Sequence, residues 1–149
     1  MHHGALYDAV RGDGPFDAVV MLDCIEHLAH PDAVIARVAS MMNPRRVLLI
    51  TTGDWDSPMA RLAGRHWRLM TPPQHLFFFA PGNLAMLLHR HGFEVEKCVH
   101  PWKLVPLGLA AYQVINRLGI RARPPRSLAA VGVPVNLYDV VRVVARKRE

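Results

Sequence analysis

The stretch Phe16-Asp-Ala-Val-Val-Met-Leu22 is a nearly continuous apolar run that follows a turn-like segment at residues 12–15. A short apolar run without alternation is typical of a strand that is buried on both faces of a sheet. A second such run, Arg46-Val-Leu-Leu-Ile-Thr51, lies further along the chain. We therefore expect two buried strands in one sheet.

The segment between these two runs has the pattern of an amphipathic helix. Pro31 suits the first turn of a helix, and Asp32 complements the helix dipole there. Asn43-Pro44 ends the pattern. The apolar side chains of one stripe are Val34, Ile35, Val38, Met41 and Met42. The order strand, helix, strand predicts a right-handed parallel crossover, so the fold class is α/β.

Regular periodicity fades over residues 53–79, where tryptophans, histidines and the Pro72-Pro73 pair accumulate. This pattern indicates a long loop with one short helix, which we expect to form a lid or pocket wall on the substrate side. The pattern beyond it predicts a helix at 83–91 capped by Gly92, a strand at 93–99, a helix at 106–118 closed by Gly119, a loop at 121–126 and a strand at 140–145.

The composition is that of one ordinary globular domain, because the chain has 149 residues, of which 51% are hydrophobic and 20% charged. Cys24 and Cys98 are too few for a disulfide framework and no export signal precedes them, which favours free buried thiols in a cytoplasmic protein. The longest uncharged apolar stretch, residues 104–116, is shorter than the roughly 20 residues of a membrane-spanning helix.

The net charge of +6 is concentrated from Arg117 onward, where most of the charged residues are arginines. A basic tail can bind nucleic acid or an anionic lipid surface. No aromatic residues alternate with these arginines, as a single-strand binding surface would need. We therefore favour a solvated basic face and expect no nucleic-acid partner.

Two segments carry a resemblance to a known family. The segment Phe16-Asp-Ala-Val-Val-Met-Leu-Asp-Cys-Ile-Glu-His-Leu-Ala-His-Pro31 resembles the fourth strand and following turn of class I S-adenosylmethionine-dependent methyltransferases of the ubiquinone-biosynthesis O-methyltransferase type. The segment Arg65-His-Trp-Arg-Leu-Met-Thr-Pro-Pro-Gln-His-Leu-Phe-Phe-Phe79, with the later His91-Gly-Phe93, is similar to the substrate-side part of the same group. The two segments occur in the order that the group has.

The resemblance implies the C-terminal part of a Rossmann-like methyltransferase sheet, mostly parallel with an antiparallel last strand. It also implies methyl transfer from S-adenosylmethionine to a small-molecule acceptor, at oxygen.

The family's glycine-rich cofactor loop has no counterpart, because Gly12 and Gly14 precede the first strand. We therefore interpret residues 1–149 as one partial, N-terminally truncated domain. The alternative function is a non-catalytic remnant or partner-binding module. A homodimer or a missing N-terminal partner could cover the exposed sheet edge at Phe16.

Asp23, Glu26 and His27 follow the first strand, at the carboxyl end where α/β sheets bind ligands. In the family, an acidic-x-x-Glu-His set can hold a divalent cation, so the resemblance implies these three residues as metal ligands. The alternative is that Glu26 and His27 line the cofactor pocket or cap the next helix. The same resemblance implies that Asp23 and Cys24 border the cofactor.

His27 is the candidate general base, because an imidazole titrates near neutrality. The alternative is a structural, hydrogen-bonded histidine. His66, Trp67 and His75 are candidate substrate-binding residues of the long loop. Trp67 could instead anchor the loop in the core, and His75 could be structural.

Overall fold

The computed structural model describes residues 14–108, 111–112, 115 and 132–149. The chain divides into two compact units, one formed by residues 1–100 and 138–149 and the other by residues 101–137. We describe each unit by itself. The single domain that the sequence analysis expects over residues 1–149 stays a prediction.

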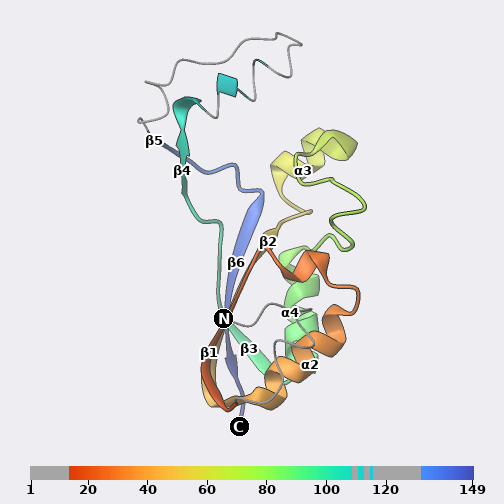
Figure 1. Ribbon diagram of the computed structural model, residues 1–149, viewed down its shortest axis with the longest axis vertical. Coiled ribbons are helices and arrows are strands. Elements are labelled where there is room, and N and C mark those ends of the chain that lie inside the picture. The colour runs from red at the N-terminus through yellow and green to blue at the C-terminus, as the bar shows by residue number, and fades with distance from the viewer. Residues whose placement is uncertain (1–13, 109–110, 113–114, 116–131) are drawn as a thin grey trace. The chain divides into compact units, whose positions relative to one another are not determined.

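The first unit has helices and strands that alternate along the chain (Figure 1). Its elements are β1 (Phe16–Leu22), η1 (Ile25–His27), α2 (Pro31–Met41), β2 (Met42–Gly53), α3 (Pro58–Ala63), η2 (Gly64–His66), α4 (Pro81–Arg90), β3 (Phe93–Val99) and β6 (Val140–Lys147). In this unit the four predicted strands are confirmed, as are the helix that begins at Pro31 and the helix that precedes Gly92. The loop with one short helix between them is confirmed as well.

The four strands of this unit form one sheet in the order β1-β2-β6-β3. β1 and β2 are parallel, and β6 is antiparallel to both β2 and β3. Three strands therefore run in one direction and the last strand of the chain runs against them. The predicted parallel pairing of the two strands that flank the helix, the α/β class and the antiparallel last strand are confirmed.

The helices α2 and α4 lie on the same side of the sheet and close the core there (Figure 1). Gly92 follows α4 with a φ of 79°, a left-handed conformation that glycine adopts without strain, as its predicted capping role requires. The side chains that pack between helices and sheet include Ile25, Ile35, Leu48, Ile50, Leu84, Leu88, Phe93, Val141 and Val143.

The prediction that the first strand is buried on both faces is wrong. Met21 faces the helices and is 4% exposed, whereas Val20 and Leu22 are 58% and 60% exposed. Alternate side chains of a strand point to opposite faces, and among the described residues no helix covers the second face of β1. β1 also has β2 as its only strand neighbour within the described part of the chain.

The second unit contains a two-stranded antiparallel ladder of β4 (Lys103–Pro106) and β5 (Gly132–Val135). The sequence did not predict this ladder. Residues 107–108, 111–112 and 115 are helical, and the other positions of the predicted helix after Pro106 lie outside the described residues. The predicted loop at 121–126 also lies outside them. No described helix has the length and apolar character that crossing a membrane requires.

Candidate functional site

The carboxyl end of β1 turns sharply into η1, and the turn and η1 together carry four of the predicted site residues. Asp23 has a φ of 46°, and its backbone N–H donates to the carbonyl oxygen of Thr51 at 2.9 Å. The Thr51 hydroxyl donates to the Asp23 carboxylate at 3.3 Å. Asp23 is therefore fixed against the end of β2.

Glu26 lies at the centre of the site and is buried, with 5% of its surface exposed. The hydroxyl of Thr52 donates to Oε2 of Glu26 at 2.8 Å. The carbonyl oxygen of Glu26 accepts from the backbone N–H groups of Leu76 and Phe77 at 2.8 and 3.2 Å. These two bonds join the long loop to η1, so they bring the loop to the end of β1.

This connection places His75 beside His27, with ring centroids 4.7 Å apart and an interplanar angle of 62°. Nδ1 of His27 lies 2.6 Å from the carbonyl oxygen of Gln74, and Nδ1 of His75 lies 2.6 Å from the carbonyl oxygen of Leu69. A carbonyl oxygen can only accept, so each ring donates its Nδ1–H. Nε2 of each neutral ring is therefore the basic nitrogen.

Glu26, His27 and His75 each offer one potential ligand atom, and these atoms all lie within 4.8 Å of one another. Two of the three are the predicted metal ligands, and the third is a predicted substrate residue. Asp23 lies outside this group of three. Cys24, the other residue predicted to border the cofactor, is a half-buried free thiol. Burial, and after it the Glu26 carboxylate, raises the pKa of Cys24.

The remaining predicted residues lie in different environments. Trp67 is buried, donates its indole N–H to Asp139 at 3.4 Å and packs near Trp55 and Phe78. This arrangement favours the alternative that Trp67 anchors the loop. His66 is exposed and accepts a hydrogen bond from the Arg65 guanidinium at 3.2 Å. Cys98, expected to be buried, is exposed, so that prediction is wrong.

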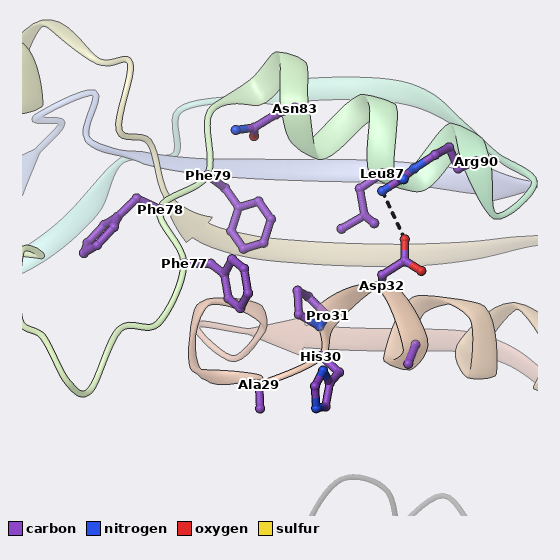
Figure 2. A pocket seen from close by; sticks show the side chains of 11 residues that line it. Ala29, His30, Pro31, Asp32, Phe77, Phe78, Phe79, Asn83, Leu87 and Arg90 are labelled. Atoms are coloured by element: carbon purple, nitrogen blue, oxygen red, sulfur yellow. Dashed lines mark ion pairs between the residues drawn. The ribbon is translucent and has the colours of Figure 1, made fainter.

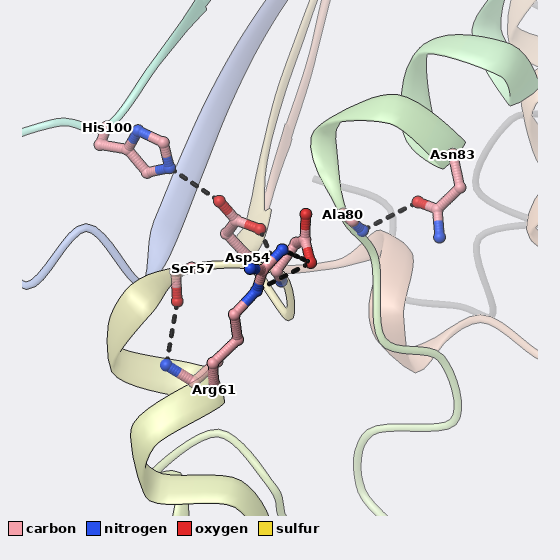
Figure 3. A network of polar contacts seen from close by, with 8 residues as sticks. Asp54, Ser57, Arg61, Ala80, Asn83 and His100 are labelled. Atoms are coloured by element: carbon pink, nitrogen blue, oxygen red, sulfur yellow. Dashed lines mark hydrogen bonds and ion pairs between the residues drawn. The ribbon is translucent and has the colours of Figure 1, made fainter.

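Several polar residues at the same end of the sheet were missed in the sequence. Asp139 is buried and accepts two hydrogen bonds from Arg68, at 2.7 and 3.1 Å. Asp54 is buried beside His100, whose Nε2 lies 2.8 Å from the carboxylate (Figure 3). The available signal was the change from apolar to polar residues at Thr51, Thr52 and Asp54, where the second strand ends.

An open cavity of about 560 Å³ lies between the start of α2 and the length of α4 (Figure 2). The rings of Phe77 and Phe79 are stacked along one side, and an ion pair between Asp32 and Arg90 lies at the other. None of the predicted site residues lines this cavity. Its walls consist of Ala29, His30, Pro31, Asp32, Ala33, Phe77, Phe78, Phe79, Asn83, Leu87 and Arg90.

Comparison with solved structures defines the class of fold. An S-adenosylmethionine-dependent methyltransferase from Thermotoga maritima aligns with 91% of this chain and 58% of its own chain, at 16% identity and a TM-score of 0.57. The magnesium protoporphyrin IX methyltransferase of Synechocystis PCC 6803 aligns with 97% of this chain and 49% of its own, at 14% identity and a TM-score of 0.53. The fold is that of the Rossmann-like methyltransferases.

The sequence comparisons show the family. The family model described as a methyltransferase domain matches residues 2–97, so the chain belongs to the methyltransferase domain family. The ubiquinone biosynthesis O-methyltransferase of Xanthomonas axonopodis pv. citri is 30% identical over 105 residues, which cover 64% of this chain and 44% of that protein. The enzyme of the same name from Sinorhizobium fredii is 28% identical over 110 residues, which cover 73% of this chain and 39% of that protein. The chain thus spans less than half the length of these relatives.

Proposed function

We propose that the chain takes part in methyl transfer from S-adenosylmethionine to an oxygen of a small-molecule acceptor. Membership of the methyltransferase domain family supports the reaction class. The names of the curated relatives support oxygen as the methylated atom. The observation that carries the proposal is the meeting of Glu26, His27 and His75 at the carboxyl end of β1, since ligands of α/β sheets bind at that edge.

His27 is the proposed general base. Its Nδ1–H is held by the Gln74 carbonyl oxygen, which leaves Nε2 to accept a proton and also stabilises the imidazolium that results. Nε2 would take the proton of the acceptor hydroxyl as the oxygen forms its bond to the methyl carbon. Bound S-adenosylmethionine would supply that methyl group, and the electron pair of its carbon–sulfur bond would remain on sulfur.

The cofactor and substrate roles follow from position. Asp23 and Cys24 form the turn that leaves β1, and we propose that they border S-adenosylmethionine. His75 and His66 belong to the loop that we propose receives the acceptor, and Trp67 supports that loop from the core. A divalent cation is a further proposed component of this site.

The open edge of β1 supports a proposal about partners. The exposed apolar residues Val20 and Leu22 are of the kind that a neighbouring strand or helix covers in an α/β sheet. We propose that a second copy, or a partner chain carrying the glycine-rich cofactor loop, pairs there. The alternative function, a non-catalytic partner-binding module, rests on the same edge.

Calorimetric titration of the purified chain with S-adenosylmethionine, and with S-adenosylhomocysteine as the product control, tests the proposal. We expect saturable binding, and loss of methyl transfer in His27→Ala with binding retained. His89→Ala is the matched control, because His89 lies exposed at the end of α4. A folded chain that binds neither compound would favour the partner-binding module over the enzyme.

A further inference from the structure

We propose that Asp139 is a positioning residue for the site at the end of β1, because it anchors the loop whose carbonyl oxygens hold the rings of His27 and His75. This inference rests on the proposed function, in which His27 is the general base. Asp139 acts on the two rings through Trp67 and Arg68, which it binds directly.

Asp139 lies at the same edge of the sheet as the site, although it comes much later in the chain. β6 runs antiparallel to β2, and its first residue, Val140, pairs with Gly53 at the end of β2. The carbonyl oxygen of Asp139 accepts from the backbone N–H of Asp54 at 3.0 Å. The residue is buried, with 2% of its surface exposed. The sheet therefore holds Asp139 as a fixed point against which a loop can be placed.

The carboxylate of Asp139 accepts three hydrogen bonds from two consecutive residues of the loop. The Arg68 guanidinium donates two of them, at 2.7 and 3.1 Å, and the indole N–H of Trp67 donates a longer one, at 3.4 Å. A guanidinium that binds a carboxylate through two N–H groups adds geometric specificity as well as energy. The loop is therefore anchored at Trp67 and Arg68.

The carbonyl oxygen of Leu69, directly after Arg68, is the first group that this anchor places. It accepts from Nδ1 of His75 at 2.6 Å and from the backbone N–H of Thr71 at 3.0 Å. The carbonyl oxygen of Thr71 accepts in turn from the backbone N–H groups of Gln74 and His75, at 2.9 and 3.2 Å. The turn over residues 69–75 is closed by its own hydrogen bonds, so its position depends on how it is anchored.

The same turn places the carbonyl oxygen of Gln74, which accepts the Nδ1–H of His27 at 2.6 Å. A free neutral imidazole prefers to carry its proton on Nε2, and a hydrogen bond to the other nitrogen can reverse this preference. With the proton on Nδ1, Nε2 of His27 is the nitrogen that can accept a proton. A displaced turn would release the ring to its ordinary tautomer, in which Nε2 carries the proton and cannot act as a base.

The turn has a second anchor at its other end, where the backbone N–H groups of Leu76 and Phe77 donate to the carbonyl oxygen of Glu26. These bonds join neutral groups, and hydrogen bonds to charged groups contribute more to stability. Loss of the Asp139 carboxylate leaves the anchor at Glu26 in place. We therefore expect the turn to shift while the protein stays folded.

Long-range nitrogen–proton NMR spectra of the imidazole rings test the proposal, because they identify the nitrogen that carries the proton without requiring any activity. At about pH 8.5, where histidines are ordinarily neutral, we expect His27 and His75 of the wild type in the Nδ1–H form. Asp139→Asn keeps the shape of the side chain, but its amide group cannot accept both bonds from Arg68. Both rings should therefore gain the Nε2–H form in this variant.

Hydrogen exchange measures the same loop through its backbone. The amides of Leu76 and Phe77 should exchange about tenfold faster in Asp139→Asn, because the loop opens more easily without its charged anchor. Arg68→Lys keeps the charge but loses the two-pronged geometry, so it should give a smaller change in the same direction in both measurements. This variant also tests the proposal if Asp139→Asn does not fold.

Ile35→Val is the control that separates positioning from stability, because Ile35 is fully buried in the core on α2 and is not part of the loop. Its tautomers should be those of the wild type. Nε2–H rings in the wild type, unchanged rings in folded Asp139→Asn, or the same change in Ile35→Val would each overturn the proposal. Titration with S-adenosylmethionine tests the proposed function separately. A wild-type chain with Nδ1–H rings that does not bind this compound would contradict the enzyme and leave the positioning by Asp139 intact.

Discussion

The hydroxyl of Thr52 donates a 2.8 Å hydrogen bond to the carboxylate of Glu26, and both side chains are buried. Thr52→Val keeps the shape of the side chain but leaves the Glu26 carboxylate without this donor. An unsatisfied buried acceptor costs about 1–3 kcal/mol, so the free energy of unfolding should fall by that amount. Urea denaturation measures it.

Thr52→Ser is the matched variant for this bond, because serine keeps the hydroxyl and loses only a methyl group. We expect Thr52→Ser to remain closer to the wild type than Thr52→Val does. If both variants lose the same stability, the methyl group rather than the hydrogen bond stabilises this position.

Gly53 is the last residue of β2, and a Cβ atom at this position would lie 2.9 Å from the side chain of Trp67 and 2.9 Å from that of Leu69. The Leu69 side chain can move, but Trp67 is buried and held by its bond to Asp139. Gly53→Ala should therefore lower the free energy of unfolding by about 1–3 kcal/mol, the usual cost of overpacking. Thermal or urea unfolding measures the change.

Gly82→Ala provides the comparison, because no atom lies within 4 Å of a Cβ built on Gly82 in α4. Alanine is favoured over glycine in a helix by up to about 1 kcal/mol, so this variant should be as stable as the wild type or more stable. Equal stability of the two variants would show that Trp67 does not restrict position 53.

The elements that local patterns define were predictable from the sequence. The apolar runs of β1 and β2 and the stripe of α2 each lie in one segment, and the structure has all three elements, although β2 begins at Met42, which the sequence placed on the helix stripe. The ladder of β4 and β5 was not predictable, because its strands lie far apart in the chain and pair through backbone groups that have no sequence pattern.

The candidate site was predictable only in part for the same reason. Glu26 and His27 follow a strand, so their position was visible in the sequence. The contact of His75 with His27 depends on backbone bonds from Leu76 and Phe77 to Glu26, within a loop that has no periodicity. The exposure of Val20 depends on what packs against the second face of the sheet, which the apolar run itself does not reveal.

Asp32 at the start of α2 should make stability depend on pH. A hydrogen bond from His91, together with the charges of His91 and Arg90, lowers the pKa of Asp32 below its ordinary value. A carboxyl group whose pKa is lower in the folded state stabilises the fold above its unfolded pKa, and this contribution is lost as the pH falls through the folded pKa. The stability difference between the wild type and Asp32→Asn should therefore shrink as the pH falls below about 4.

Urea midpoints of both proteins over the acidic range measure this difference. In a His91→Ala background the pH-dependent part should be smaller, because the hydrogen bond that is the largest cause of the shift is removed. A difference between wild type and Asp32→Asn that stays constant with pH would contradict the role of Asp32.

A substitution at Val20 tests whether the edge strand β1 associates with a second copy of the chain. Its side chain is 58% exposed next to Leu22, on a strand whose only described neighbour is β2. Exposed apolar edge strands pair with other chains, and a charged residue on such a strand opposes this pairing. We expect the wild-type chain to associate as its concentration rises and Val20→Lys to associate less, as measured by sedimentation velocity. Met86→Lys is the matched control, because Met86 is also exposed but lies on α4. A wild-type chain that stays monomeric, or equal effects of the two lysines, would show that the edge of β1 does not bind a second copy.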